Sequence, residues 1–433
     1  MSQSLADKIA AREARVGVIG LGYVGLPLVV EFAKAGMKSL GFDIDEKKVD
    51  QINRGESYIG DVPGDEVKAM VESGFLRATT DFAELAEVDT VDICVPTPLR
   101  KTGDPDLSYV VSAVDEIASH LKMGQLVILE STTYPGTVKE VVRPKLEAGG
   151  LKAGRDFYLA FSPERVDPGN TQWKTRNIPK VVGGVDDAST EVAKLLYQQV
   201  VDTVVTVSDT TVAEMVKLLE NTFRAVNIGL ANELALMCRR LGVDVWEVID
   251  AAKSKPFGYM PFYPGPGLGG HCIPIDPFYL SWKAKQNGFE SRFIELAGHI
   301  NAGMPRYVVE RIGDALNSQA RAINGSRVHL FGVAYKPNVS DIRESPAIDI
   351  ALLLEERGAR LSYSDPYVPR LSEKTLVLDS IDPDEALQGG IDCAVITTDH
   401  AGFDYENIAR RAPVVVDTRN ALKGVERDNI FKL

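Results

Sequence analysis

The chain has 433 residues, 45% hydrophobic and 25% charged, which is typical of a globular protein of about three domains and excludes disordered or fibrous classes. Acidic residues outnumber basic ones by 61 to 48, and the net charge of −13 disfavours nucleic acid and anionic membranes as partners. Four separated cysteines indicate neither a metal site nor a disulfide framework, and without a leader or a long apolar run we expect a cytoplasmic protein.

Short apolar runs alternate with helix-period segments through the first two hundred residues. The runs cover residues 16–20, 40–44, 91–96, 126–130 and 157–161. Such alternation predicts a parallel sheet with crossover helices, and hence an α/β fold.

The middle of the chain predicts helices around one unusual loop. A periodic segment from Ser208 or Asp209 to Gly242 predicts a long helix, and residues 289–317 predict another that is interrupted at Pro305. Between them, residues 256–270 are rich in proline and glycine and contain four aromatics, so they form either a linker or a site. Cys272 and Asp276, which follow at once, favour a site.

The last third repeats the pattern of the first. Strands are predicted at residues 328–333, 360–364, 393–397 and 414–417, with a helix at 345–357. In both regions the second apolar strand ends at an aspartate, Asp43 or Asp365, which indicates architectural kinship. We therefore predict two doubly wound Rossmann-like domains, residues 1–200 and 319–433, joined by a central helical region at residues 201–318.

A glycine fingerprint predicts the cofactor. GLGYVG at residues 20–25 follows a strand and opens a helix, the context in which Gly20 makes a tight turn, Gly22 admits a pyrophosphate and Gly25 lets helix meet strand. Asp43, 18 residues past Gly25, suits ribose hydroxyls and repels a 2′-phosphate, so NAD is favoured over NADP. The predicted cofactor contacts also include Tyr23, Val24, Thr97, Ser131 and Thr132; the last three end strands, where turn chemistry is the alternative explanation.

Three further residues carry candidate chemistry. Cys272 lies in a glycine-rich loop, and we interpret it as a nucleophile that captures an aldehyde beside a nicotinamide, rather than as an inert small hydrophobe. Lys217 and Asn221 share one face of the long helix at i,i+4 spacing. Spacing alone favours the plainer alternative, a surface lysine paired with Glu214 or Glu220.

Several ordered motifs across nearly the whole chain resemble those of the UDP-sugar 6-dehydrogenases. They are GLGYVGLP at 20–27, SPER at 162–165, EMVKLLEN at 214–221, GGHCIPID at 269–276, FGVAYKP at 331–337 and DIRESP at 341–346. The resemblance implies a catalytic cysteine at Cys272, and it favours the active-site interpretation of Lys217 and Asn221. It also implies a base-supporting Asp276, a hydrolysis-linked Glu164 and a water-binding Thr132.

The resemblance also suggests which sugar is oxidised. Ile275 replaces a lysine common in the UDP-glucose enzymes, and residues 263–270 most resemble bacterial UDP-N-acetylglucosamine enzymes of surface polysaccharide (O-antigen, lipopolysaccharide) pathways. We therefore expect a cytoplasmic homodimer that oxidises UDP-N-acetyl-D-glucosamine to its uronic acid, with UDP-N-acetylmannosamine or UDP-glucose as alternatives. The expected substrate contacts are Glu164, Arg165, Lys217, Asn221, Tyr263, Gly269 and, for the diphosphate, Lys336 and Arg343. Arg343 has an alternative as an ion pair with Asp341 or Glu344.

The expected reaction removes four electrons. Cys272 adds to the aldehyde formed by the first oxidation, Lys217 and Asn221 stabilise the thiohemiacetal oxygen, and the resulting thioester is hydrolysed. Two rivals remain: a two-electron hydroxyacid dehydrogenase, which releases one NADH instead of two, and a non-catalytic nucleotide-binding protein, which turns over no UDP-sugar.

Overall fold

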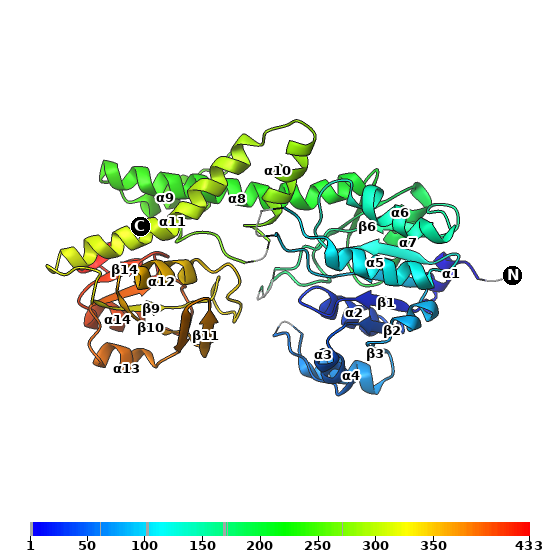
Figure 1. The fold of residues 1–433 in the computed structure, drawn as a ribbon, viewed down its shortest axis with the longest axis horizontal. Helices are drawn as coiled ribbons and strands as arrows, with labels where there is room; N and C mark the ends of the chain where they lie inside the picture. Colours follow the sequence, from blue (N-terminus) through cyan, green and yellow to red (C-terminus); the bar gives the residue numbers. More distant parts are fainter. Residues whose placement is uncertain (1–2, 61, 101–103, 168–169, 171, 271) are drawn as a thin grey trace. The chain divides into compact units, whose positions relative to one another are not determined.

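The computed structural model describes residues 3–60, 62–100, 104–167, 170, 172–270 and 272–433, and it divides into two compact units. The N-terminal unit comprises Met1–Glu220 and Phe278–Asn287, and the C-terminal unit comprises Asn221–Pro277 and Gly288–Leu433. Figure 1 labels their elements. The α/β class and the two Rossmann-like sheets predicted from the sequence are confirmed, whereas the domain boundaries at residues 200 and 318 stay a prediction.

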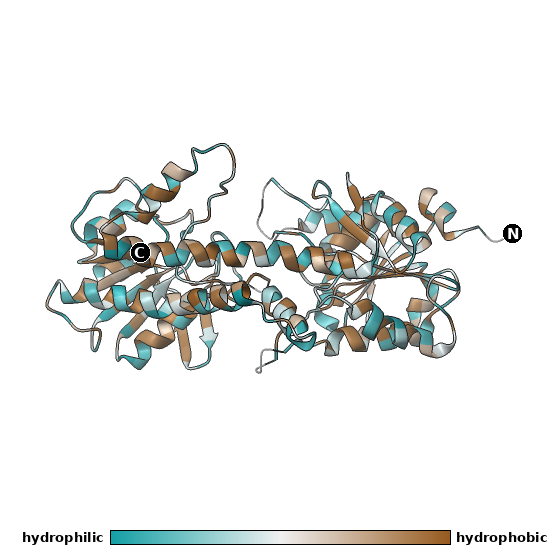
Figure 2. Cartoon of the chain, turned by 90° about the horizontal axis from the view of Figure 1, so that it is seen from above, coloured by the Kyte–Doolittle hydropathy of each residue, from teal (hydrophilic) through white to brown (hydrophobic). Residues whose placement is uncertain are grey.

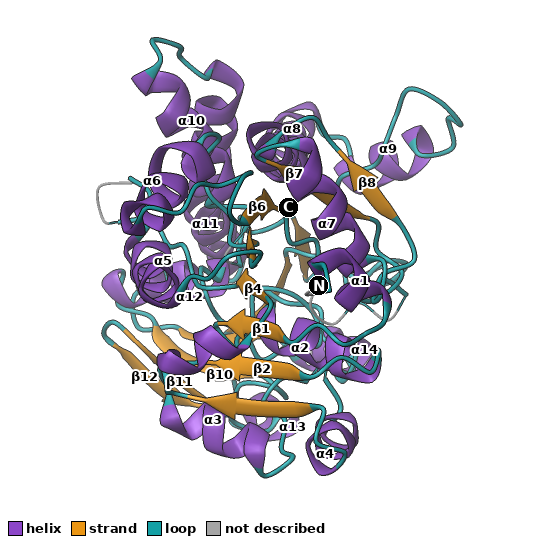
Figure 3. Cartoon of the chain, turned by 90° about the vertical axis from the view of Figure 1, so that its right-hand side faces the viewer, coloured by secondary structure: helices purple, strands orange, loops and turns teal. Residues whose placement is uncertain are grey.

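The N-terminal unit is built on an eight-stranded sheet (Figures 1 and 3). All its pairings are parallel except that of β6 with β7. In sheet order the strands are β3 (Leu76–Thr79), β2 (Ser39–Phe42), β1 (Val16–Ile19), β4 (Thr90–Ile93), β5 (Leu126–Leu129), β6 (Tyr158–Phe161), β7 (Lys180–Gly184) and β8 (Val204–Thr206). Its first six strands follow the order of a dinucleotide-binding fold, which places the carboxyl ends of β1, β2, β4 and β5 along one edge.

Helices cover both faces of this sheet because its strands are apolar on both sides. Along β5, Leu126 and Ile128 pack into one hydrophobic cluster, and Val127 and Leu129 pack into another. The helices are α1 (Leu5–Ala10), α2 (Gly25–Lys34), α3 (Glu46–Asn53), α4 (Gly64–Glu72), α5 (Ser108–His120), α6 (Arg143–Leu146) and α7 (Asp187–Tyr197).

The C-terminal unit contains a five-stranded parallel sheet and a two-stranded antiparallel one. The strands of the larger sheet are, in order, β10 (Arg360–Ser364), β9 (Arg327–Phe331), β13 (Cys393–Ile396), β14 (Val415–Asp417) and β15 (Ile430–Lys432); the pair is β11 (Arg370–Glu373) and β12 (Leu376–Asp379). Helices of this unit are α9 (Val245–Ala252), α11 (Arg292–Asn317), α12 (Pro346–Glu356), α13 (Pro383–Gln388) and α14 (Tyr405–Arg411).

Two helices belong to both units along the chain. These are α8 (Thr210–Leu241) and α10 (Asp276–Gln286). Asp209 caps α8, since its carboxylate accepts a hydrogen bond of 2.9 Å from the Val212 N–H. In Figure 2, apolar and polar residues alternate along α8, as expected of an amphipathic helix.

One helix differs from its prediction. The sequence predicts that Pro305 interrupts the helix at residues 289–317, but α11 runs unbroken from Arg292 to Asn317 with Pro305 inside it. Met304, Pro305 and Val308 are buried, so packing of this apolar stretch offsets the hydrogen bond that proline cannot donate.

None of the helices in the described part of the chain combines the length and apolar character needed to cross a membrane.

Candidate active site

The loop between β1 and α2 is shaped by its three glycines. Gly20 has a φ of +90°, and a Cβ there would lie 2.8 Å from the Cys94 carbonyl oxygen. A Cβ on Gly25 would lie 1.9 Å from the Gly20 carbonyl oxygen, so helix and strand meet only because both residues lack side chains. A Cβ on Gly22 would meet no atom within 4 Å. The backbone at Gly22 is therefore not covered by other protein atoms, and its contact with a pyrophosphate stays a prediction.

The start of α2 and the end of β2 fit a dinucleotide. Val24 precedes α2 without a capping side-chain hydrogen bond, which leaves N–H groups at the helix start available to a pyrophosphate. Asp43 is 7% exposed, and its carboxylate accepts hydrogen bonds from the N–H groups of Leu21 (2.9 Å) and Asp45 (3.0 Å). The Lys48 ammonium is a third, longer donor to it at 3.4 Å. A carboxylate accepts about four hydrogen bonds, so Asp43 retains capacity for a ribose hydroxyl. Tyr23, beside this turn, is 38% exposed.

The predicted nicotinamide-side residues follow β4 and β5. The Ser131 hydroxyl donates to the Val95 carbonyl (2.6 Å), which joins the two strand ends. Thr97 and Thr132 are half-buried. Sequence reasoning missed Tyr279, whose hydroxyl donates to the Thr97 carbonyl at 2.9 Å, because this residue lies 182 positions away in α10.

Lys217 is not the surface lysine of the plainer alternative. It is 8% exposed, and its ammonium donates to the Glu164 main-chain carbonyl at 2.5 Å. Both acids offered as its partners are engaged elsewhere: Glu220 pairs with Arg165, and Glu214 accepts hydrogen bonds from the Gly136 and Val138 N–H groups. The structure thus brings Lys217 to Glu164 and directs the Arg165 guanidinium to Glu220.

Asn221 and Asp276 meet in the C-terminal unit. The Asn221 amide donates to the Asp276 carboxylate at 2.5 Å, and the two side chains are 7% and 2% exposed. Burial of a carboxylate requires such a donor, since an unpaired buried charge is costly. The amide thereby holds Asp276 at the first residue of α10.

Cys272 precedes the same helix. Its carbonyl accepts hydrogen bonds from the N–H groups of Ile275 (3.0 Å) and Asp276 (2.8 Å), which form the turn that starts α10. Cys272 is half-buried, whereas Cys94, Cys238 and Cys393 are buried. Burial raises the pKa of the Cys94 and Cys393 thiols, so those two are poor nucleophiles. Accessibility near a helix start singles out Cys272 as the candidate nucleophile; His271 lies outside the described residues.

The loop at residues 256–270 is anchored rather than free. The Gly265 N–H donates to the Asn232 side-chain carbonyl (2.9 Å), and the Gly270 N–H donates to the Arg343 carbonyl (3.0 Å). A Cβ on Gly269 would lie 2.7 Å from the Tyr335 Cβ, so this glycine permits a close approach to residues 335–346. Tyr263 faces a different neighbour: its hydroxyl donates to Asp250 at 2.8 Å.

Those contacts bring the candidate diphosphate residues beside the glycine loop. Arg343 forms an ion pair with Asp341 (2.6 Å), as its alternative interpretation predicted, but the arginine side chain is 47% exposed and such pairs exchange partners at little cost. Lys336 lies on the same connection. Ser345 occupies the position just before α12, but its side chain makes no capping hydrogen bond. Its buried hydroxyl has no partner among the described residues.

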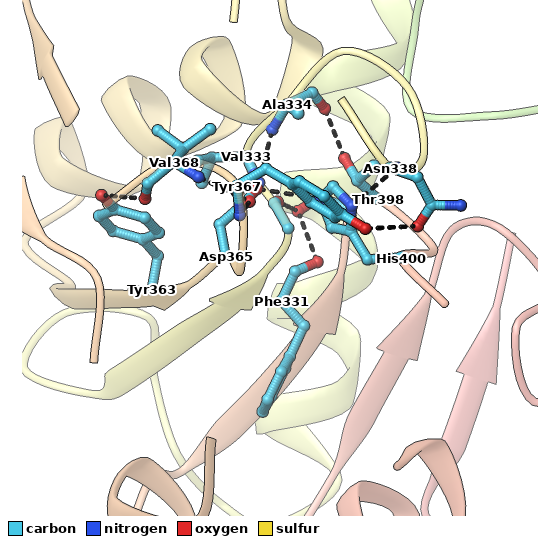
Figure 4. A network of polar contacts seen from close by, with 12 residues as sticks. Phe331, Val333, Ala334, Asn338, Tyr363, Asp365, Tyr367, Val368, Thr398 and His400 are labelled. Atoms are coloured by element: carbon cyan, nitrogen blue, oxygen red, sulfur yellow. Dashed lines mark hydrogen bonds and ion pairs between the residues drawn. The ribbon is translucent and has the colours of Figure 1, made fainter. Parts of the chain in front are cut away.

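Asp365 was expected to match Asp43, and it occupies the equivalent place after β10. Figure 4 shows its contacts with Val333, Ala334 and His400. Its carboxylate accepts from the N–H groups of Val333 (2.7 Å) and Ala334 (3.1 Å) and contacts the His400 ring at 3.0 Å. Tyr367 and Val368 donate two more hydrogen bonds. Five donors saturate this carboxylate, so it has no capacity left for a ribose.

Comparison with known proteins identifies the class of enzyme. The UDP-glucose/GDP-mannose dehydrogenase family matches the chain in three parts: its NAD-binding domain at residues 14–201, its central domain at 211–303 and its UDP-binding domain at 329–424. The chain therefore belongs to this family and is an NAD-dependent UDP-sugar dehydrogenase.

Individual relatives agree with this assignment. The UDP-N-acetyl-D-mannosamine dehydrogenase of Methanococcus maripaludis is 37% identical over 423 residues, which cover 94% of this chain and 93% of the relative. The solved UDP-D-ManNAc dehydrogenase of Pyrococcus horikoshii matches with a TM-score of 0.88 and 33% identity, over 96% of this chain and 98% of that one. A UDP-glucose dehydrogenase from Pyrobaculum islandicum has a TM-score of 0.86 and 30% identity, over 96% and 97%.

Proposed function

We propose that this dehydrogenase oxidises the 6-hydroxyl of UDP-N-acetyl-D-glucosamine to the carboxylate, with release of two NADH per sugar. The observation that carries the four-electron reaction is Cys272, a half-buried thiol at the turn that starts α10. A two-electron dehydrogenase needs no such nucleophile.

Different residues of this protein carry out different steps of the proposed reaction. NAD, when bound, accepts the hydride in each oxidation, and the open loop at Gly22 with Asp43 would hold it. Cys272 forms a C–S bond to the aldehyde carbon, and the Lys217 ammonium and Asn221 amide stabilise the negative oxygen that results. Oxidation of this adduct leaves a thioester on Cys272.

Hydrolysis then frees the enzyme. A water held by Thr132 adds to the thioester carbon, its proton passes to a carboxylate, and the C–S bond breaks to return the Cys272 thiolate. Glu164 and Asp276 are the proposed proton acceptors. Glu164 is half-buried and Asp276 is buried, and each accepts a hydrogen bond from a neighbouring donor. For Glu164, burial is outweighed by the Lys180 charge and the backbone donors, which bring its pKa below the usual value and so keep it ionised and able to accept a proton.

The substrate assignment rests on Ile275 and on the loop at residues 263–270. Ile275 supplies no cation where the UDP-glucose enzymes commonly have a lysine, and the loop resembles the N-acetylglucosamine branch. UDP-N-acetylmannosamine is the second candidate, because the relatives at 36–38% identity carry that name. The two sugars differ only at C2, and identity of this size spans enzymes with different sugars, as the UDP-glucose relative illustrates.

The deciding experiment measures kcat/KM for the three UDP-sugars under one set of conditions, together with NADH released per sugar. We expect UDP-N-acetylglucosamine to exceed UDP-glucose by at least ~100-fold, because glucose leaves buried groups for the acetamide unpaired. A preference for the mannosamine epimer would assign the second candidate. A glucose preference would overturn the N-acetyl assignment, and one NADH per sugar would overturn the four-electron reaction.

A further inference from the structure

A buried chain of ionisable groups lies behind Glu164 in the N-terminal unit. Asp92 in β4, Glu130 after β5 and Tyr197 at the end of α7 are 0% exposed, and Lys180 at the start of β7 is 7% exposed. The Tyr197 hydroxyl contacts Asp92 Oδ1 (2.7 Å) and also Glu130. The Lys180 ammonium lies 2.8 Å from Glu130 and 3.5 Å from Glu164. Of these groups and Glu164, the proposed reaction uses only Glu164.

The protons shared among Asp92, Tyr197 and Glu130 can be counted. A phenol carries one proton, so Tyr197 can donate to only one of the two carboxyl groups it contacts. The other carboxyl must donate to the phenol oxygen, and therefore carries a proton itself. Oδ2 of Asp92 is buried without a hydrogen-bond partner, which is costly for an ionised carboxylate and tolerable for a neutral acid. The proton accordingly belongs on Asp92, and Tyr197 donates to Glu130.

Lys180 links this pair to Glu164. Glu164 also accepts hydrogen bonds from the N–H groups of Arg165 (2.6 Å) and Val166 (2.5 Å). Burial by itself would raise the pKa of Glu164, but the Lys180 charge and these backbone donors bring that pKa below its usual value. Burial raises the pKa of both Asp92 and Glu130. Lys217 is the other cation near Glu164, and the neutral Cys94 thiol lies among the same groups.

We propose that Lys180 is a positioning residue that holds Glu164 ionised for proton transfer. Asp92, Tyr197 and Glu130 share one stored proton, and the negative charge on Glu130 offsets part of the electrostatic effect of Lys180 on Glu164. This role rests on the proposed part of Glu164 in thioester hydrolysis. When Glu164 accepts a proton, Lys180 remains neutralised by Glu130, so no buried cation is left unpaired.

The proposal predicts opposite effects of two substitutions. In a plot of hydrolysis rate against pH, the rate falls at low pH as Glu164 becomes protonated, and this part of the plot is the acid limb. Lys180→Met removes the cation, so the acid limb should move up by at least about one pH unit, and the rate on that limb should fall about 10-fold. Glu130→Gln removes the competing carboxylate, so the limb should move down. Lys180→Arg should restore the wild-type profile. In each variant KM for the UDP-sugar should change less than about 2-fold, since neither residue is proposed to bind it.

The measurement is single-turnover thioester hydrolysis against pH, with Lys152→Met as the matched control. Lys152 belongs to the same unit and pairs with Glu147 at 3.3 Å on the surface. Limbs that stay in place, or that move in the same direction in both variants, would overturn the proposal. Should Lys180→Met not fold, Lys180→Met combined with Glu130→Gln removes both buried charges together and should still raise the limb.

The stored proton has a test that needs no turnover. Burial raises the pKa of Glu214 to about 7, so other carboxyl groups also contribute to the infrared C=O band of neutral carboxylic acids. The difference spectrum between wild type and Asp92→Asn at neutral pH should therefore contain such a band from Asp92, and its absence from the difference spectrum would refute the proton assignment. Wild-type NADH yield is measured first. A failure there overturns the proposed function, whereas a normal yield with unmoved pH limbs overturns only the role of Lys180.

Discussion

At the scale of single residues, solvent accessibility separates the candidate nucleophile from the other cysteines more clearly than the local sequence does. All four are present as thiols; Cys94, Cys238 and Cys393 are buried, whereas Cys272 is half-buried. A thiol acts as a nucleophile as its thiolate, and partial positive charge at a helix start favours that form. The turn whose N–H groups contact the Cys272 carbonyl places this residue at the start of α10.

Cys272→Ser should stop the reaction before the second oxidation, because a serine hydroxyl at neutral pH is too weakly ionised to form the adduct. NADH released per sugar should fall from two to at most one, while NAD and UDP-sugar bind within about 3-fold of wild type. Turnover assays and calorimetric titration measure these quantities. Cys238→Ala, at a buried cysteine of α8, is the control and should keep two NADH; full four-electron activity in Cys272→Ser would contradict the covalent route.

Asp43 should set the preference for NAD over NADP. Its carboxylate is already held by the Leu21 and Asp45 N–H groups, so Asp43→Ala would disturb the loop as well as the ribose site. Asp43→Asn keeps the size of the side chain and one of these two backbone hydrogen bonds, and it removes the charge that repels a 2′-phosphate. We expect the NAD/NADP ratio of kcat/KM to fall at least about 10-fold, the equivalent of one charged hydrogen bond. An unchanged ratio in Asp43→Asn would place the selectivity elsewhere.

At the scale of elements, the two sheets share one turn but use it differently. Gly20 and Gly332 both have positive φ after the first strand, and the next residue donates its N–H to an aspartate at the end of the second strand. Asp43 receives two such backbone bonds, whereas Asp365 is saturated by four of them and by His400. Asp365 therefore cannot accept hydrogen bonds from ribose hydroxyls in the way proposed for Asp43, and the UDP-binding assigned to this part of the chain must use other groups.

Asn232 should be the anchor of the glycine-rich loop. Its amide accepts from Gly265 and donates to Asn301 at 2.8 Å, and Asn301 donates to the Ala225 carbonyl. Asn232→Ala leaves buried groups unpaired and should destabilise the protein by about 1–3 kcal/mol and speed proteolysis within residues 256–270. Asn227→Ala is the control: this half-buried asparagine of α8 donates to the Phe223 carbonyl of its own helix, and its loss should cost less than about 0.5 kcal/mol. Equal protease sensitivity of the two variants would show that the loop is anchored elsewhere.

At the scale of the whole molecule, one apolar surface is notable. Helix α8 has 32 residues and is about 48 Å long. Exposed apolar side chains recur along it at spacings of three, four or seven residues, that is, one or two helical turns. They are Val212, Met215, Leu219, Phe223, Leu230, Met237 and Leu241. An exposed stripe of this size is typical of a protein interface, and we propose that it forms the interface of the homodimer predicted from the sequence.

Charges on this stripe should weaken the proposed dimer. Leu219→Lys with Leu230→Lys replaces two side chains that are 58% and 53% exposed, so the folded chain itself should tolerate both. We expect the dimer dissociation constant to rise at least about 100-fold, measured by light scattering over a dilution series. Met123→Lys, at a residue 72% exposed outside α8, should leave it unchanged. A dimer of unaltered strength would exclude α8 as the interface.

The local pattern of the sequence was sufficient for much of the fold. Residues 16–20, 40–44, 91–96, 126–130 and 157–161 all contain strands, because a parallel strand buried on both faces is a continuous apolar run bounded by polar residues. Strand β3 and helix α9 were missed, since β3 has an exposed arginine at its second position and α9 is only eight residues long.

The sequence by itself determined the glycine turn, the aspartate after β2, the candidate nucleophile and the pairing of Lys217 with Asn221 on one helix, because each depends on residues close in the chain or on motif resemblance. Only the tertiary structure decided that Lys217 bonds to Glu164, that Asp365 is saturated, and that Lys180 lies between Glu130 and Glu164. Those contacts join residues 16 to 53 positions apart and depend on which strand ends lie side by side. Local periodicity carries no information on that arrangement, because it is set by the order of strands in the sheet.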